Sequence, residues 1–425
     1  MNRSDQWDWS TDKRMLADMG SWEEKYAKPM DPVPSQDGER IAAVVGTGEM
    51  EFGVCVNGEV WEAGYDKVWH LQYGPDDRLS ALVSDTGMWT VAVEGAAWEN
   101  SFEFVWQPVV SEDGANLAVG GQAGMEFCAV KNDIPWATRY TNLTDLTISS
   151  GGDKTAATVQ TISFKEGDIF TFQKGCYSVA VDGVAWDTNY VNVYNPIFNS
   201  DGSRVAAAVR TNLYDYTIVV DGKPWETSYP SVWEPKFSPK DGSVTAPVKT
   251  PKGWILAENG QPLWKRAFQQ LWQHQYSLDG SRLAAIVAVK FGKWTVAVDG
   301  KPWSCTFDDF VDDLVFSPDG SRVACVGKSG DQLTVAVDGK PWGDTYDMVW
   351  APVFSPDGRR VAATVEKNGQ QAIVVNGTVV SDSWSALWAP VFSPGGDKLL
   401  MRGIAINSAP QYVRQVVSLK DLSIK

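Results

Sequence analysis

Short apolar runs, each bounded by Gly, Pro, Asp or Ser, recur along almost the whole chain. Residues 323–326 (Val-Ala-Cys-Val) and 334–337 (Thr-Val-Ala-Val) are typical, and both lack the polar–apolar alternation of a half-solvated strand. Runs of roughly four to eight residues between turn signals predict β-strands rather than helices. Because apolar side chains point to both sides of such strands, the pattern predicts small sheets that are covered on both faces.

The apolar runs belong to a sequence repeat. Residues 316–324 and 354–362 share the pattern Phe-Ser-Pro-Asp-Gly-x-Arg-Val-Ala, and ten copies follow one another about 40 residues apart, the period of a propeller blade. The position of the arginine is occupied in the ten copies by Arg40, Arg78, Asn116, Lys154, Arg204, Val244, Arg282, Arg322, Arg360 and Lys398. Each copy predicts three inner strands and a short outer strand that carries an Asp-Gly-Lys-Pro-Trp motif.

These features together predict an all-β fold, a β-propeller of ten four-stranded modules. The Ser-Pro-Asp-Gly segment is a tight turn, and the bulky indole of the outer strand suits the gap that widens between neighbouring blades. Ten blades exceed the usual four to eight. We expect one ten-bladed ring, because no linker interrupts the repeat; two five-bladed propellers are the alternative.

The tenth copy ends without an outer strand. Near the start of the chain, Trp22, Tyr26 and Pro32 reproduce the spacing of Trp342, Tyr346 and Pro352. We therefore expect an N-terminal arm at residues 1–20 and a propeller at 21–425, whose closing blade combines 21–28 with 385–425 and leaves no open edge. About a dozen extra residues near 163–172 should lengthen one hairpin of the fourth copy.

Composition narrows the possible functions. Lys and Arg number 37 against 53 Asp and Glu, and the net charge of −16 argues against nucleic-acid binding. The first residues contain no apolar leader, and the longest apolar stretch, residues 283–289, is far shorter than the ~20 residues of a membrane helix. The expected location is therefore the cytoplasm, with reduced cysteines and no direct membrane span.

Tryptophan is the unusual component, with 21 copies. The tight Asp-Gly turns should lie on one face of the propeller, and the longer hairpins and Tyr-x-x-Val-Trp connections on the other, which is the candidate working face. Six tryptophans share the Val-Trp position: Trp69, Trp106, Trp233, Trp272, Trp350 and Trp388. They are either interblade packing residues or anchors for a protein partner.

Two further segments are candidate partner-binding sites. The hairpin insertion carries Phe164, Phe170 and Phe172. An acidic segment of the eighth copy carries Asp308, Asp309, Asp312 and Asp313, which could bind a cation or a basic partner, or form a solvated loop.

The chain carries few residues suited to catalysis. It has no nucleophile elbow, no zinc-protease motif and no phosphate-binding glycine loop. Its two histidines, His70 and His274, hold similar but not identical places in their repeats, and its five cysteines form no C-x-x-C pair. We therefore expect no catalytic residues, no metal site and no cofactor.

The Phe-Ser-Pro-Asp-Gly repeat resembles the WD40-like propeller repeats of the TolB family, and this resemblance covers nearly the whole chain. In length, tryptophan abundance and lack of a signal or membrane span, the chain also resembles the TmcD family, the tryptophan-rich cytoplasmic subunits of the transmembrane redox complex of sulfate-reducing bacteria. That resemblance implies a cofactor-free accessory subunit, peripheral to the inner membrane, whose partners are the subunits of a membrane electron-transfer complex. A scaffold for another protein and a hydrolase or lyase with a central-funnel site are the alternatives.

Overall fold

The computed structural model describes residues 3–26, 29–165, 167–381, 383–406 and 409–420. Almost all regular structure is β, in the order of four-stranded antiparallel units that the repeat predicts. The helices of the described residues are η1 (Arg3–Gln6), α1 (Met19–Lys25) and α2 (Ile169–Lys174).

We number the four-stranded units as modules 1 to 10 in chain order. The strands of modules 1 to 4 are β2 (Met30–Pro34), β3 (Ile41–Gly48), β4 (Glu51–Val56) and β5 (Glu59–Val60); β6 (Lys67–Tyr73), β7 (Leu79–Asp85), β8 (Met88–Val93) and β9 (Ala96–Ala97); β10 (Phe104–Val110), β11 (Leu117–Ala123), β12 (Glu126–Lys131) and β13 (Ile134–Pro135); β14 (Leu143–Ile148), β15 (Thr155–Gln160), β16 (Tyr177–Val181) and β17 (Val184–Ala185). In each module the strands pair in sequence order.

Modules 5 to 8 repeat this topology. Their strands are β18 (Asn192–Phe198), β19 (Val205–Arg210), β20 (Tyr216–Val220) and β21 (Lys223–Pro224); β22 (Lys236–Phe237), β23 (Val244–Thr250), β24 (Gly253–Glu258) and β25 (Gln261–Pro262); β26 (Gln270–Tyr276), β27 (Leu283–Lys290), β28 (Lys293–Val298) and β29 (Lys301–Pro302); β30 (Phe310–Phe316), β31 (Val323–Ser329), β32 (Gln332–Val337) and β33 (Lys340–Pro341).

Modules 9 and 10 share one ten-stranded sheet, because Gln371 pairs with Trp384. The same contact occurs between other modules as an isolated bridge, for example Leu333 with Tyr346. The strands are β34 (Met348–Val349), β35 (Val353–Phe354), β36 (Val361–Lys367), β37 (Gln370–Val375) and β38 (Thr378–Val379), followed by β39 (Trp384–Leu387), β40 (Val391–Phe392), β41 (Lys398–Ala405) and β42 (Gln411–Ser418), with β1 (Lys13–Asp18) added at the edge.

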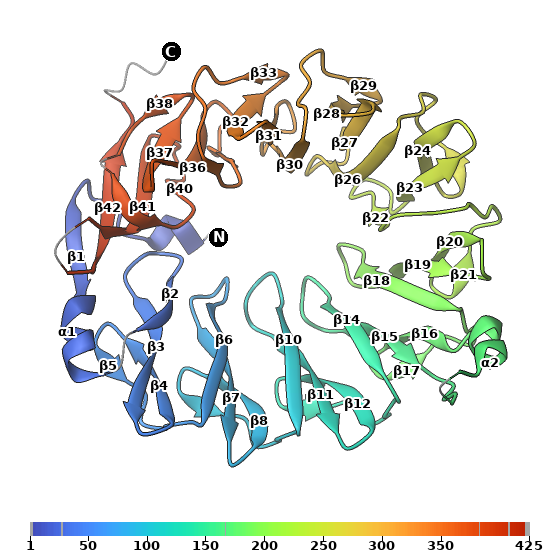
Figure 1. Cartoon of the computed structure of the whole chain (residues 1–425), viewed down its shortest axis with the longest axis horizontal. Coiled ribbons are helices and arrows are strands. Elements are labelled where there is room, and N and C mark those ends of the chain that lie inside the picture. Colours follow the sequence, from blue (N-terminus) through green and yellow to red (C-terminus); the bar gives the residue numbers. More distant parts are fainter. Residues whose placement is uncertain (1–2, 27–28, 166, 382, 407–408, 421–425) are drawn as a thin grey trace. The chain divides into compact units, whose positions relative to one another are not determined.

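The chain divides into two compact units. Unit 1 comprises residues 1–46, 55–60 and 268–425, and unit 2 comprises 47–54 and 61–267. Inside unit 2 the first strand of one module packs across the three inner strands of the module before it, as β18 does on β14, β15 and β16 (Figure 1). Inside unit 1, β30 packs in the same way on β26, β27 and β28. The inner strands are buried on both faces, as the apolar runs predict.

Each module has two ends. We call the end with the turn between its first and second strands the turn end, and the end with the hairpin between its second and third strands the hairpin end. In the turn of module 8, Ser317 Oγ donates to the carboxylate of Asp319 (2.5 Å), Ser321 N donates to the same carboxylate (3.1 Å), and Gly320 has a φ of 69°. These bonds hold the pKa of Asp319 at about 2.

An arginine joins the turn ends of successive modules. In module 8, Arg322 Nε pairs with Asp338 (2.9 Å), and Nη1 donates to the carbonyls of Gly358 and Arg359 in module 9 (both 3.1 Å). Arg204 and Arg282 make the same pair of contacts from modules 5 and 7. The repeated arginine therefore links one blade to the next, which explains its place in the repeat.

The outer-strand tryptophans pack against the next module. A β-carbon added at Gly339 would lie 3.1 Å from Trp303, and one at Gly183 would lie 3.3 Å from Trp136, so these Asp-Gly turns face an indole. In module 9 this position is held by Val380, whose N–H bonds to Ile373 O (2.9 Å) as the N–H of outer-strand tryptophans does elsewhere.

The closing blade of module 10 differs from the expected one. Its added strand is β1 at Lys13–Asp18, which pairs with β42, and not residues 21–28. Asp18 instead caps helix α1 by accepting a hydrogen bond from Gly20 N (3.2 Å), so Met19 and Trp22 become buried on one helix side. The closing strand β1 therefore lies within residues 1–20, which the sequence predicted to be a separate N-terminal arm. Residues 27–28, 407–408 and 421–425 of the predicted blade lie outside the described residues.

Trp22 nevertheless does what the outer-strand tryptophans do. A β-carbon added at Gly58, in the turn between β4 and β5 of module 1, would lie 3.4 Å from the Nε1 atom of Trp22. The predicted spacing thus identified the right packing residue and assigned it the wrong local structure.

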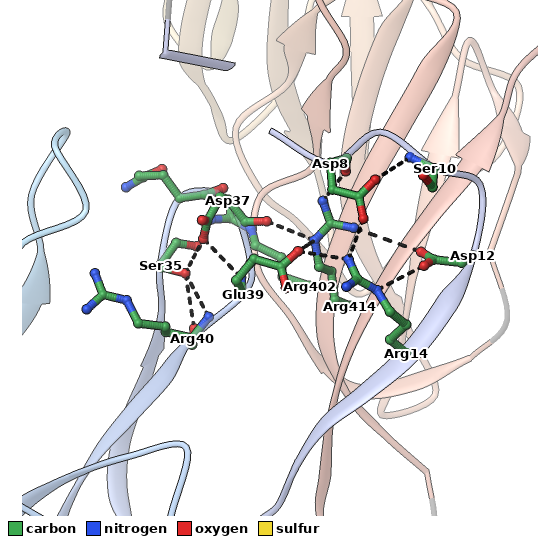
Figure 2. A network of polar contacts seen from close by, with 12 residues as sticks. Asp8, Ser10, Asp12, Arg14, Ser35, Asp37, Glu39, Arg40, Arg402 and Arg414 are labelled. Carbon is green, nitrogen blue, oxygen red and sulfur yellow. Dashed lines mark hydrogen bonds and ion pairs between the residues drawn. The ribbon is translucent and has the colours of Figure 1, made fainter. Parts of the chain in front are cut away.

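A buried polar network ties module 10 to module 1 within unit 1 (Figure 2). The fully buried Arg414 pairs through Nε with Glu39 (3.0 Å) and donates to the carbonyl of Asp37 (3.0 Å). Arg402 donates from Nη1 to the carbonyl of Ser35 (2.8 Å). Arginines of the last module therefore hold the first turn of module 1, at the same end where Arg322 joins modules 8 and 9.

Candidate partner-binding surface

The Val-Trp position lies beside a bulge in the first strand of most modules. The register of β6 against β7 shifts after Trp69, and that of β10 against β11 shifts after Trp106. The next residues, His70 and Gln107, have φ values of 50° and 51°. Because a bulge re-aims the neighbouring side chains, it sets the direction of the tryptophan.

The six tryptophans differ in exposure. Trp69, Trp233 and Trp350 are 47%, 42% and 39% exposed. Trp106, Trp272 and Trp388 are half-buried. The structure thus places all six at the surface to some extent, and three of them offer enough ring area for a partner to cover.

Most of these tryptophans also pack on a second ring of their own module. Trp69 lies 4.5 Å from Trp89 between ring centroids, Trp272 lies 4.5 Å from Trp294, and Trp388 lies 6.1 Å from Tyr412. Trp233 stacks on Trp254 in the same manner, at 5.6 Å. One side of the indole is therefore supported while the other can face solvent, so packing and binding do not exclude each other.

Modules 2 and 3 of unit 2 carry the longest row of such rings, which we call the aromatic ladder. Its members, in chain order, are Trp69, Trp89, Phe104, Trp106 and Phe127. Phe104 of module 3 bridges the modules, 6.4 Å from Trp69 and 6.0 Å from Trp89. Trp106 follows at 6.1 Å from Phe104, and Phe127 lies 5.9 Å from Trp106. Lys67 places its ammonium 6.0 Å from both the Trp69 and Trp89 rings.

The hairpin ends carry a second feature, of which the sequence pattern indicated only Phe170. Large apolar side chains at least 78% exposed occupy this hairpin in five modules: Met50, Met125, Phe170, Tyr214 and Phe291. An apolar residue inside a tight polar turn, as in Glu49-Met50-Glu51, is the signal that could have revealed them. Exposed apolar side chains that recur at one structural position are a common mark of an interaction surface.

The insertion of module 4 forms helix α2, which lies on the β15–β16 connection (Figure 1). Asp168 caps it by accepting from Thr171 N (3.0 Å). Phe164 and Phe172 pack together at 5.8 Å, whereas Phe170 is exposed. The structure therefore divides the three candidate phenylalanines into a supporting pair and one available ring. Residue 166 lies outside the described residues.

The four aspartates of the acidic segment of module 8 also have different surroundings. Asp308 pairs with Lys293, and Asp309 accepts a hydrogen bond from Gly330 N (2.6 Å) at its own hairpin. Asp312 occupies the Val-Trp position, and burial together with Asp312 raises the pKa of Asp313. Across the described residues no three His, Cys, Asp or Glu side chains are grouped so as to hold a metal ion.

The histidines and cysteines do not add to this surface. His70 is exposed beside Trp69, whereas His274 is buried in β26. Cys55, Cys128, Cys176 and Cys325 are buried and Cys305 is half-buried. Burial raises the pKa of every one of these thiols, to about 11 for Cys55, so they stay protonated near neutral pH.

Comparisons with known proteins give the following results. No protein-family model matches the chain, and no curated protein matches it. A crystal structure of a eukaryotic initiation factor is 13% identical over 79% of this chain and 92% of that chain, with a TM-score of 0.49. The Dos1 propeller is 10% identical over 96% and 94% of the two chains, with a TM-score of 0.39. Puromycin hydrolase is 13% identical over 72% of this chain and 58% of its own, with a TM-score of 0.37.

The described part of the chain holds no helix with the length and apolarity needed to cross a membrane. Its ten four-stranded antiparallel modules, with first strands packed across the preceding sheet inside each unit, make it a multi-blade β-propeller.

Proposed function

We propose that this β-propeller is a non-catalytic, protein-binding subunit whose partner docks on the hairpin ends of its modules. The observation that carries the proposal is the aromatic ladder with Trp69 at its exposed end. Half-exposed tryptophans that rest on a second ring are rigid, and such residues dominate the energy of many protein interfaces. The exposed apolar hairpin residues Met50, Met125, Phe170 and Tyr214 of the same unit lie at the same end of their modules.

The more specific part of the proposal is that the partner is a membrane-associated electron-transfer complex. The resemblance of the tryptophan-rich sequence to the TmcD family supports it. In such a complex the haems and iron–sulfur clusters belong to the other subunits, and this chain acts without a cofactor at the periphery of the inner membrane. Its role is then to hold partner subunits together rather than to carry electrons.

Affinity capture from native membranes tests the proposal. The full chain and its Trp69→Ala variant are used as baits, with Ile134→Ala as the matched control, because Ile134 is an exposed apolar residue of outer strand β13. We expect the wild type and Ile134→Ala to capture haem-containing subunits and Trp69→Ala to lose them.

Two results would change the proposal in different ways. Capture of a partner that contains no redox cofactor retains the docking surface and refutes the electron-transfer role. Equal capture by all three baits refutes the docking surface itself.

A further inference from the structure

A cavity of about 270 Å³ opens at the hairpin end of module 2, inside unit 2. Tyr65, Val83, Asp85, Met88 and Ala97 are among the residues that line it. Val83, Met88 and Ala97 supply an apolar wall, Tyr65 and Asp85 supply a phenol and a carboxylate, and Thr86, Thr90 and Ser101 add hydroxyl groups. A wall of this kind suits the methylene groups of a long side chain whose polar tip reaches the carboxylate.

Two of the polar groups that line this cavity, the Tyr65 hydroxyl and the Asp85 carboxylate, are not used by the described part of the fold. The Tyr65 hydroxyl is buried and has no hydrogen-bond partner among the described residues. The Asp85 carboxylate accepts no hydrogen bond from the described part of the chain, and together with burial it raises the pKa of Tyr65. An unpaired buried hydroxyl costs stability, and such a cost is recovered when a ligand supplies the missing bond.

The other cavity of this unit gives a useful contrast. It measures about 280 Å³ and lies at the turn ends of modules 2 and 3. There Asp76 pairs with Arg78, and Asp133 accepts from the N–H groups of Glu99 and Asn100 (2.8 and 3.0 Å). Its carboxylates are already occupied, so nothing in it calls for a ligand.

Charge around the hairpin ends of modules 1 to 3 is strongly acidic. Six exposed carboxylates belong to these hairpins and to the connections beside them: Glu49, Glu51, Asp66, Asp85, Glu103 and Glu126. Lys67, which lies over the ladder, is the basic residue next to them. Opposite charges across an interface steer association and fix its register, so this surface selects a basic partner.

The cavity and the aromatic ladder lie on the two faces of one strand. Met88 lines the cavity and Trp89, the next residue of β8, belongs to the ladder. Successive side chains of a strand point to opposite faces. A segment that crosses the β7–β8 hairpin can therefore reach both features, with a cation in the cavity and an apolar or cationic side chain on the rings.

We propose that the cavity binds one Lys or Arg side chain from a basic, apolar segment of the partner protein. This inference rests on the proposed function and names the chemistry of its partner. The alkyl part of the side chain lies against Val83 and Met88, and its cationic tip donates hydrogen bonds to the Asp85 carboxylate and the Tyr65 hydroxyl. Neighbouring apolar residues of the segment cover Trp69.

The test uses random heptapeptides displayed on phage and selected on the immobilised full chain. We expect the enriched peptides to contain Lys or Arg beside apolar residues. One enriched peptide is then made with a fluorophore, and its affinity is measured by fluorescence anisotropy for the wild type, Asp85→Asn, Tyr65→Phe and Trp69→Ala. The control is Asp331→Asn, because Asp331 is an exposed carboxylate in the corresponding hairpin of module 8.

Asp85→Asn should weaken binding at least about tenfold, since a hydrogen bond to a charged group is lost. Tyr65→Phe should weaken it less and leave the melting temperature at or above that of the wild type, because the change removes a buried hydroxyl that has no partner in the free protein. Replacing the basic residue of the peptide by norleucine should reproduce the Asp85→Asn loss, and Asp331→Asn should bind normally.

Enrichment of acidic or uncharged peptides, or of none, overturns the inference, as does normal affinity of Asp85→Asn. If Asp85→Asn binds normally while Trp69→Ala does not, the docking surface stands and only the cavity assignment fails. If neither variant changes peptide affinity, the inference and the proposed docking surface fail together.

Discussion

The turn end of module 8 and the hairpin end of module 2 use their polar side chains in opposite ways. At the turn end, Ser317 and Asp319 satisfy each other and the backbone, and Arg322 joins its module to the next. At the hairpin end, Tyr65 and Asp85 remain unpaired beside a cavity, and Trp69 keeps about half of its surface exposed. The turn end is thus occupied by joints of the fold, and the hairpin end is free to bind.

This contrast explains why the same residue type can have two roles. Trp136 and Trp303 pack against glycines of the next module and stabilise the stack of blades. Trp69 and Trp233 rest on another ring of their own module and face outward. Position in the module, rather than residue type, therefore separates structural tryptophans from candidate anchors. The following substitutions test that separation, from the largest expected effect to the smallest.

Arg414→Ala should be the most damaging change. The side chain is fully buried, and its loss leaves Glu39, which is about one third exposed, with Arg14 as its ion-pair partner and leaves the carbonyl of Asp37 without a donor. Removal of the buried member of an ion pair costs up to about 3–5 kcal/mol. Urea denaturation should show this loss, with Arg359→Ala, an exposed arginine of module 9, as a control that stays near wild type. Near-normal stability of Arg414→Ala would show that the network of Figure 2 does not hold module 10 to module 1.

Trp136→Ala should cost about 3 kcal/mol of unfolding free energy, the lower end of the range for a buried tryptophan. The indole packs on Tyr140 and Gly183, and its N–H bonds to the hydroxyl of Thr155 (2.9 Å). Trp136→Phe should recover part of the loss. A Trp136→Ala variant as stable as wild type would remove the distinction between the two groups of tryptophans.

Arg322→Ala should have a smaller effect, about 1 kcal/mol. Its ion pair with Asp338 is partly exposed, where such pairs contribute little, and its two bonds to carbonyls add a modest amount. Chemical denaturation of this variant beside Arg282→Ala should give similar losses, because both residues make the same joint. A loss of unfolding free energy as large as that of Arg414→Ala would mean that the repeated arginines contribute far more to stability than their partial exposure suggests.

The turn aspartates predict a weak dependence of stability on acid. Serine hydrogen bonds lower the pKa of Asp279 and Asp319 from 3.8 to about 2. A lowered pKa in the folded state stabilises the protein above pH 3.8, and this stabilisation is lost as the pH falls toward 2. The double variant Asp279→Asn/Asp319→Asn should lose less stability than wild type between pH 4 and pH 2. An identical pH profile would show that these bonds do not favour the ionised form.

Much of the fold could be predicted from sequence because the same pattern of strands and turns occurs in ten copies. Each copy shows the same turn, the same buried inner strands and the same outer tryptophan, so errors in one copy are corrected by the others. The closing strand occurs once and lacks this redundancy. Trp22 has the spacing of an outer-strand tryptophan, yet Asp18 caps a helix there and the pairing strand is Lys13–Asp18.

The candidate site was less predictable, because exposure and pairing depend on contacts between modules. The six Val-Trp residues were found from spacing. Spacing does not show that Trp69, which packs on Trp89, is 47% exposed, whereas Trp106 is more deeply buried. The cavity beside Asp85 combines residues of a hairpin, an outer strand and two connections, and no local pattern marks it. Asp309 shows the reverse case, since a suggestive acidic run contains a residue that bonds to its own hairpin.

The central claim is that the hairpin end binds and the turn end supports the fold. The most direct test measures unfolding free energy and capture of the membrane partner for Trp69→Ala and Trp136→Ala side by side. The account predicts that Trp69→Ala unfolds within about 1 kcal/mol of wild type yet loses its partner, because half of its ring is already in water. It also predicts that Trp136→Ala, at a temperature where it remains folded, still captures the partner. A Trp69→Ala variant that loses about 3 kcal/mol, or that keeps its partner, would contradict the account.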